Sequence, residues 1–285
     1  MDSLCIQKSI VSVTAPGSHL EPGDDHLGRQ LARECNNFMA SIVKAHPLRF
    51  GFFASLPLPD IEGSLREIDY AINVLGADGI GLMSNSHGIY PGDSTFEAIF
   101  QRLDTLGAKV FIHPNHCRYA HVAGSFQKIP ELLPVVPSSI LEYFFDTGRA
   151  LTSLLHSGTA AAHPNVTFII AHCGAILPLV LEKITGFATK CLNMRGLPTS
   201  EDVRADLNRH FFFDTAGFMC PDQLPAILKL VTPDRLLFGT DLPFLPFAVA
   251  KDLSQELDDS IQTHCGQQWL SDVYCLNAEK LLRRE

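Results

Sequence analysis

The stretch KVFIHPNHCRYA, residues 109–120, ends a predicted buried strand on a histidine. Apolar and β-branched residues lead into His113, and Pro114 then stops the strand because proline has no N–H for a sheet hydrogen bond. The stretch VTFIIAH ends in the same way on His172, and RLLFGTD ends on Asp241. Three ligand-type residues at the carboxyl ends of three apolar strands predict one functional site.

Seven short apolar runs have the composition of buried strands. They occupy residues 8–14, 49–57, 78–85, 109–114, 166–172, 210–217 and 235–241. Segments with helical spacing of their apolar residues lie between them, and two of these segments end in a glycine, at Gly76 and Gly107, as helices often do. Residues 115–165 form the longest interruption, in which we expect an insertion followed by a helix.

Strands that alternate with helices predict parallel strands joined by crossovers, as in a barrel or a doubly wound sheet. No GxGxxG or GxxxxGK[ST] motif follows the first predicted strand, so the sequence lacks the signature of a dinucleotide-binding or P-loop fold. Functional-looking residues at several strand ends favour a TIM-type barrel, whose site lies at that face. Seven predicted strands are one fewer than such a barrel has.

The composition fits a globular protein with a sizeable core. Of the 285 residues, 46% are hydrophobic and 19% are charged, and this length allows one large α/β domain or two small ones. The net charge of -9 argues against nucleic acid or an anionic membrane surface as the main partner. An anionic substrate would therefore need a local cation or a bound metal.

The eight cysteines are scattered through the chain without a CxxC pair, which argues against a zinc ribbon or a thioredoxin motif. Such scattered thiols fit a reducing compartment. The N-terminal segment has no basic stretch followed by a long apolar run, and no apolar run reaches the roughly 18 residues that a membrane span needs. We expect a cytoplasmic protein.

Each strand-end residue has a functional and a structural interpretation. His113 is either a metal ligand or a core histidine that bonds to a backbone carbonyl. His172 suits metal binding, acid–base chemistry or substrate orientation, or it caps a tight turn before a helix that begins near Pro178. Asp241 can bind a metal or act as a base, although an aspartate before a helix is often an N-cap. For Asp214, which also ends a strand, we predict a structural hydrogen-bonding role.

With these residues in place, the sequence resembles the amidohydrolase-related, metal-dependent decarboxylases. This family is typified by aminocarboxymuconate-semialdehyde decarboxylase, γ-resorcylate decarboxylase and fungal 6-methylsalicylate decarboxylase, and the last branch is the most similar. The resemblance follows the chain in order through these blocks: VSVTAPG, LARECNNFMASIVKAHPLRFGFFASLPLPD, GADGIGLMSNSHGIYPGDSTFEAIFQRLDTLGAKVFIHP, IIAHCGAILPLVLEKI, FFFDTAGF and LLFGTDLPF.

The resemblance implies a fold, a reaction and a set of roles. The fold would be a (β/α)8 TIM barrel of the metal-dependent hydrolase type with its first strand absent, formed as a single domain over residues 1–285. The reaction would be the non-oxidative decarboxylation of a 2-hydroxybenzoate-type acid, with 6-methylsalicylate a candidate, at a divalent metal, most often zinc. His113 would be a metal ligand, Asp241 a metal ligand and proton handler, and His172 the catalytic histidine. A homodimer is plausible by the same resemblance.

One family feature is missing. The family opens with a strand that carries an HxH or ExH ligand pair, and none of the twelve histidines lies two residues from another His or Glu in an early strand. By this resemblance we expect that the chain begins one strand late and that the active enzyme is longer, through a shortened gene model or an alternative start. A catalytic zinc normally keeps about three protein ligands, which puts metal occupancy of this chain in question.

Two other functions remain open at this stage. A lactonase or amidohydrolase would use the same metal-activated chemistry on a carbonyl group, and a catalytically impaired relative would keep only the fold. Arg118 and Arg195 are candidate partners for a substrate carboxylate, because guanidinium groups bind carboxylates in a bidentate manner.

Overall fold

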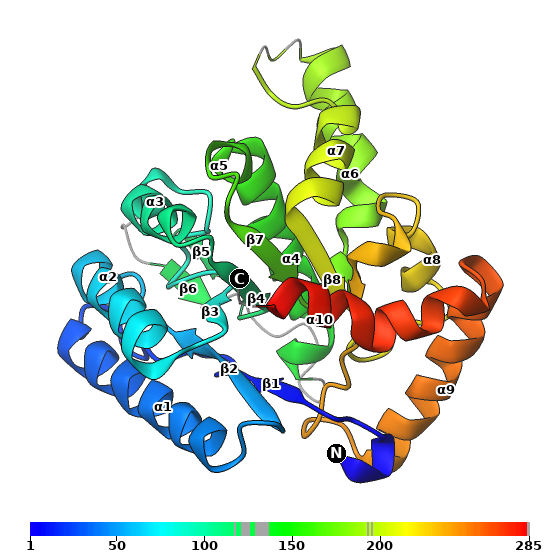
Figure 1. Cartoon of the computed structure of the whole chain (residues 1–285). Helices are drawn as coiled ribbons and strands as arrows, with labels where there is room; N and C mark the ends of the chain where they lie inside the picture. The colour runs from blue at the N-terminus through cyan, green and yellow to red at the C-terminus, as the bar shows by residue number, and fades with distance from the viewer. Residues whose placement is uncertain (117, 121–125, 129–136, 193, 195, 284–285) are drawn as a thin grey trace. The chain divides into compact units, whose positions relative to one another are not determined.

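The computed structural model describes residues 1–285 except 117, 121–125, 129–136, 193, 195 and 284–285 (Figure 1). The chain divides into two compact units, Met1–Phe168 and Ile169–Glu285. Each unit is described by itself below. A single barrel domain over the whole chain stays a prediction.

The first unit contains four parallel strands in the order β1-β2-β3-β4. These strands are β1 (Ser9–Val11), β2 (Phe50–Ser55), β3 (Gly79–Met83) and β4 (Lys109–His113). Each lies inside one of the apolar runs that the sequence analysis identifies, and each is joined to the next by a crossover that contains a helix. Met83 pairs with His113, so β3 and β4 end at the same level. The polar residues that follow these two strands are therefore neighbours.

Helices cover this sheet in the alternating order that the sequence predicts (Figure 1). They are α1 (Asp25–Ala45), α2 (Ile61–Tyr70), α3 (Glu97–Thr105), α4 (Ser138–His156) and the short α5 (Thr159–Ala162). A π-helical turn, Ala71–Leu75, extends α2 and ends at Gly76, which has a left-handed φ of 71°. This conformation is the one that glycine adopts most easily, and it confirms Gly76 as the residue that ends the helix.

The long segment 115–165 contains the expected helix, α4, and a feature that the sequence analysis does not predict. Two short antiparallel strands, β5 (Arg118–Ala120) and β6 (Phe126–Lys128), form a separate two-stranded sheet. Their sequences, RYA and FQK, contain charged and polar residues and so do not form the apolar runs by which the other strands were recognised.

The second unit continues the alternation of strands and helices. Strand β7 (Thr167–Ile170) spans the boundary and contributes its last two residues to this unit, which also contains β8 (Phe211–Asp214) and β9 (Leu236–Leu237), in the order β7-β8-β9. Strands β8 and β9 are parallel. Its helices are α6 (Leu177–Gly186), α7 (Ser200–His210), α8 (Gln223–Ile227), α9 (Phe247–His264) and α10 (Asn277–Leu282). All seven predicted strands are thus present among the described residues.

Buried phenylalanines fill the interior of each unit. Phe52 and Phe100 are almost fully buried in the first unit, and Phe211 and Phe213 are fully buried in the second. Loss of such a ring typically costs about 3–5 kcal/mol, because a cavity remains. These cores hold the strands whose ends carry the polar residues considered below.

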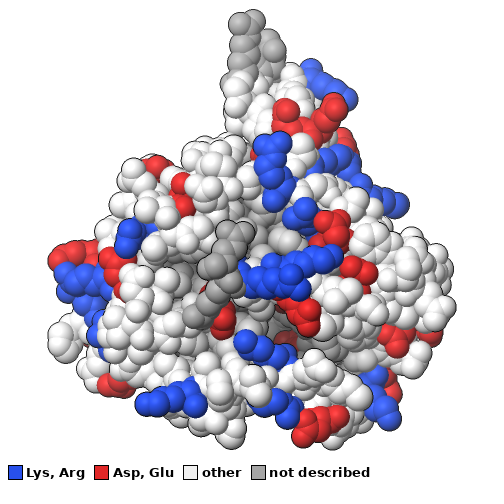
Figure 2. Space-filling model, viewed as in Figure 1, with Lys and Arg blue, Asp and Glu red and all other residues white. Residues whose placement is uncertain are grey.

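Charged side chains of both signs are interspersed over the face shown in Figure 2, without a large patch of one sign. No helix among the described residues is long and apolar enough to cross a membrane.

The start of α2 is fixed by a nearly buried carboxylate. Asp60 is 8% exposed, and its Oδ1 accepts a hydrogen bond of 3.0 Å from the N–H of Gly63, which makes it the N-cap of α2. The guanidinium of Arg29 on α1 donates to both oxygens of the same carboxylate. The hydrogen bond from Arg29 lowers the pKa of Asp60. One side chain therefore both caps α2 and ties it to α1.

We predict that Asp60→Ala lowers the free energy of unfolding by about 1–2 kcal/mol, because the first turn of α2 loses its cap. Asp60→Asn is the matched control, since it keeps the capping oxygen and loses the charge together with one acceptor for Arg29. A lowered pKa in the folded state means that the charge-dependent stability is complete above the unfolded pKa of about 3.9 and is lost as the pH falls through the folded pKa. Urea unfolding should therefore show the wild-type advantage over Asp60→Asn shrinking below about pH 4, and an advantage that stays constant down to pH 3 would contradict this account.

Candidate functional site

His113 ends β4 in the first unit with its imidazole held in one tautomer. Its Nδ1 lies 2.7 Å from the backbone oxygen of Pro114. A carbonyl oxygen only accepts, so Nδ1 carries a proton. Nε2 lies 3.5 Å from the hydroxyl of Thr14. His113 thus bonds to a backbone carbonyl, as its structural interpretation predicts. Its other ring nitrogen, Nε2, is an atom that binds metals in proteins.

His172 lies in the second unit, directly after β7, and is held by the same kind of bond. Its Nδ1 is 3.0 Å from the backbone oxygen of Ala216, so this histidine also carries its proton on Nδ1. The backbone of His172 has a left-handed φ of 57°, which is uncommon for a residue other than glycine. The side chain of Gln223 donates to the backbone oxygen of His172 at 2.8 Å and so helps to fix this turn.

Asp214 clamps the turn that carries His172. Its Oδ1 accepts the N–H of His172 at 2.8 Å and the N–H of Ala216 at 3.1 Å. Burial raises the pKa of Asp214, while the nearby His172 acts in the opposite direction. The predicted structural role of Asp214 is confirmed. Its carboxylate bonds to the backbone of His172, which carries the imidazole, and to the backbone of Ala216, whose carbonyl accepts the imidazole proton.

Asp241 follows β9 and shares its surroundings with His172. A Cβ at Gly217 would lie 3.5 Å from Nδ1 of His172 and 3.7 Å from Oδ2 of Asp241, so both side chains border this glycine. Burial raises the pKa of Asp241; His172 lowers it and Asp214 raises it further. Asp241 has a left-handed φ of 59° and is not the N-cap of α9, which is Pro246. The N-cap interpretation of Asp241 is therefore wrong.

The structure brings together two of the three predicted site residues, His172 and Asp241, within the second unit. His113 belongs to the first unit. Both side chains are of a type that binds divalent metals: an imidazole in His113, whose Nδ1 bonds to the backbone oxygen of Pro114, and a carboxyl group in Asp241. No group of three or more His, Cys, Asp or Glu side chains that could hold a metal is found in the described part of the chain. The types of these side chains therefore fit a divalent metal, but the described residues do not form a complete set of ligands.

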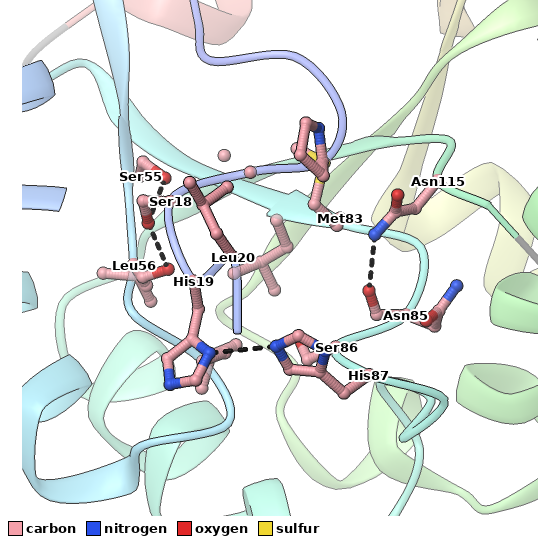
Figure 3. Close-up of a pocket in the computed structure, with 15 residues that line it drawn as sticks. Ser18, His19, Leu20, Ser55, Leu56, Met83, Asn85, Ser86, His87 and Asn115 are labelled. Carbon is pink, nitrogen blue, oxygen red and sulfur yellow. Dashed lines mark hydrogen bonds between the residues drawn. The ribbon is translucent and has the colours of Figure 1, made fainter. Parts of the chain in front are cut away.

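A pocket of the first unit opens where β2, β3 and β4 end (Figure 3). On one side of it, Nδ1 of His19 lies 2.9 Å from Nε2 of His87, and Figure 3 shows the two imidazoles facing each other. Nε2 of His19 lies 3.1 Å from Oδ1 of Asp25. On the other side, the amide of Asn115 donates to the backbone oxygen of Asn85 at 3.2 Å. The wall of this pocket is therefore largely polar.

The sequence analysis did not identify His19, His87 or Asn85 as site residues. The stretch SNSHG places polar residues directly after the apolar run of β3. This pattern resembles the one that identified His113 at the end of β4, and it could have identified Asn85 and His87. The two proposed arginines cannot be compared with the site, because Arg195 and the side chain of Arg118 lie outside the described residues.

Comparison with known proteins places the chain among the amidohydrolases. The amidohydrolase family model matches residues 6–284. The 6-methylsalicylic acid decarboxylase of Penicillium expansum is 36% identical over 244 residues, which cover 85% of this chain and 72% of that protein.

Solved structures agree in fold over almost the whole chain. An amidohydrolase II crystal structure is 29% identical with a TM-score of 0.85, and the match covers 99% of this chain and 86% of that one. The dihydroxybenzoic acid decarboxylase of Polaromonas, solved with bound manganese, is 22% identical with a TM-score of 0.78. The match covers 99% of this chain and 83% of that one. The predicted fold class, an α/β barrel of the metal-dependent hydrolase type, is confirmed, with seven of the expected strands among the described residues.

We predict that Asp214→Ala lowers the free energy of unfolding by about 2–3 kcal/mol, since the N–H groups of His172 and Ala216 lose their acceptor in a largely buried turn. Asp214→Asn should cost clearly less, because the amide retains an oxygen that can accept both bonds. Urea titrations of the two variants measure the difference. Equal losses would mean that the charge of Asp214, and not its oxygen, stabilises the turn.

Proposed function

The chain belongs to the amidohydrolase family, and on that premise we propose that it catalyses the metal-dependent, non-oxidative decarboxylation of an aromatic 2-hydroxy acid. The observation that carries the proposal is the pairing of His172 and Asp241 beside Gly217, with Nδ1 of the histidine bonded to the backbone oxygen of Ala216. The similarity to a 6-methylsalicylic acid decarboxylase supports 6-methylsalicylate as the first substrate to test.

Such a reaction needs a group that delivers a proton to the ring carbon that bears the carboxylate. The C–C bond then breaks, its electron pair restores the aromatic ring, and CO2 leaves. His172 suits this task because its Nδ1–H is fixed on the carbonyl of Ala216, so Nε2 is the atom at which a proton is gained and lost. Asp241 borders the same glycine as His172, so we propose it as a second proton handler next to His172.

We propose His113 and Asp241 as the protein ligands of the divalent metal. When bound, the metal would supply a fixed positive charge for the substrate anion. The family resemblance favours zinc, whereas the related Polaromonas structure carries manganese, so both ions belong in the test. An acidic protein, with a net charge of -9, would in this way attract an acidic substrate through a local cation.

The proposed setting is a reducing cytoplasm, which is supported by the scattered cysteines, seven of which are free thiols among the described residues. A homodimer is proposed from the family resemblance alone.

We predict that His172→Asn and Asp241→Asn each reduce CO2 release from 6-methylsalicylate by at least about 100-fold, the usual contribution of a positioned acid–base group. His26→Asn, a change on the exposed surface of α1, should leave the rate unchanged. CO2 release and phenol formation are measured with zinc and with manganese added to the metal-depleted protein.

Two results would contradict the proposed function. Ring opening of an aromatic lactone without CO2 release from any hydroxybenzoate would identify a hydrolase. Undiminished CO2 release by both variants would show that neither side chain handles the proton.

A further inference from the structure

A nearly solvent-free carboxylate on α4 anchors the residues that follow β3. Asp146 is fully buried. Its Oδ2 accepts the hydroxyl of Ser84 and, at 2.7 Å, the amide of Asn85, while its Oδ1 accepts the hydroxyl of Tyr90 at 2.7 Å. A buried carboxylate with three donors holds those donors in fixed positions, since the loss of any of these bonds would leave a buried charge poorly solvated.

The same two residues, Ser84 and Asn85, hold the chain on both sides of His113. The N–H of Ser84 donates to the backbone oxygen of His113 at 2.8 Å, and the Oγ of Ser84 accepts the N–H of Asn115 at 2.8 Å. The amide of Asn85 donates to the backbone oxygen of His116 at 2.9 Å. Every one of these bonds lies within the first unit.

A single peptide group connects this network to the imidazole. The peptide between Pro114 and Asn115 gives its N–H to Ser84, and its carbonyl oxygen accepts the Nδ1–H of His113 at 2.7 Å. Hydrogen bonds therefore run without a break from the carboxylate of Asp146 through the hydroxyl of Ser84 and the peptide to the ring of His113. Bonds arranged in such a chain polarise and strengthen one another.

We propose that Asp146 and Ser84 are positioning residues that fix the tautomer and orientation of His113 through the Pro114–Asn115 peptide. In many metal sites a carboxylate bonds directly to the metal-binding histidine. Here the hydroxyl of Ser84 and a peptide group lie between the carboxylate and the ring. The anionic end of the chain strengthens the pull on the Nδ1 proton and makes Nε2 a better electron donor. The consequence for metal binding rests on the proposed ligand role of His113, whereas the effect on the tautomer does not.

The test uses the metal-free full chain labelled with ¹⁵N-histidine, in which ring nitrogen shifts report the tautomer. His113→Asn identifies the signals of this residue. Ser84→Ala and Asp146→Asn should both move His113 from the Nδ1–H form toward a mixture with the Nε2–H form. The same variants should weaken the binding of zinc and manganese by roughly 10–100-fold, as loss of an outer partner of a metal-bound histidine commonly does.

Two control variants separate positioning from general damage to the fold. Ser153→Ala removes a serine hydroxyl that accepts the N–H of Gly92 at 3.0 Å, which is the same kind of bond elsewhere in this unit. Tyr90→Phe removes a donor from the other oxygen of Asp146 and leaves the path to His113 intact. Both controls should keep the wild-type tautomer and metal affinity, even if they lose stability.

The outcomes are distinct. If Ser84→Ala or Asp146→Asn unfolds cooperatively like the wild type and still shows pure Nδ1–H His113, the proposal is overturned. If Ser84→Ala does not fold, Asp146→Asn decides the question in the same way, and failure of both to fold while Ser153→Ala folds would overturn the positioning role in favour of a purely structural one. A tautomer change in a protein that binds no metal would support the hydrogen-bond chain and contradict the proposed metal function.

Discussion

The hydrogen bond from an imidazole Nδ1 to a backbone carbonyl is the constraint on which both proposed site histidines depend. His113 makes it to Pro114 and His172 makes it to Ala216. In each case the acceptor carbonyl lies in a turn directly after a buried strand, so the sheet determines where the ring points. In each case, too, the bond to the carbonyl places a proton on Nδ1.

Carboxylates hold both turns, although by different routes. Asp214 bonds directly to the backbone N–H groups of His172 and Ala216. Asp146 acts at one remove, through Ser84, on the peptide that accepts the ring of His113. A buried carboxylate is costly to place, and it persists where several donors satisfy it. The repeated use of this device at two predicted strand ends indicates that the orientation of the imidazoles matters.

The sequence predicted the strand framework well because buried parallel strands are nearly continuous apolar runs. All seven runs became strands, and the residues at their ends could be named in advance as His113, His172, Asp214 and Asp241. The pair β5–β6 was missed because its strands, RYA and FQK, contain charged and polar residues and form no apolar run. The N-cap interpretation of Asp241 failed because α9 begins several residues later, at Phe247.

The supporting residues could not be predicted, because their partners are distant in the chain. Asp146 lies 62 positions from Ser84, and His19 lies 68 positions from His87. Only the folded sheet, with β3 and β4 ending at one level, brings such residues to the same place. Local pattern therefore revealed which residues end the strands, while tertiary packing determined which side chains hold them.

The central claim is that this chain is a metal-dependent enzyme, and the metal-to-protein ratio of the purified chain tests it most directly. Elemental analysis after removal of loosely bound ions should give close to one zinc or manganese ion per chain. A ratio close to zero in a protein that is folded by circular dichroism and unfolds cooperatively would contradict the claim.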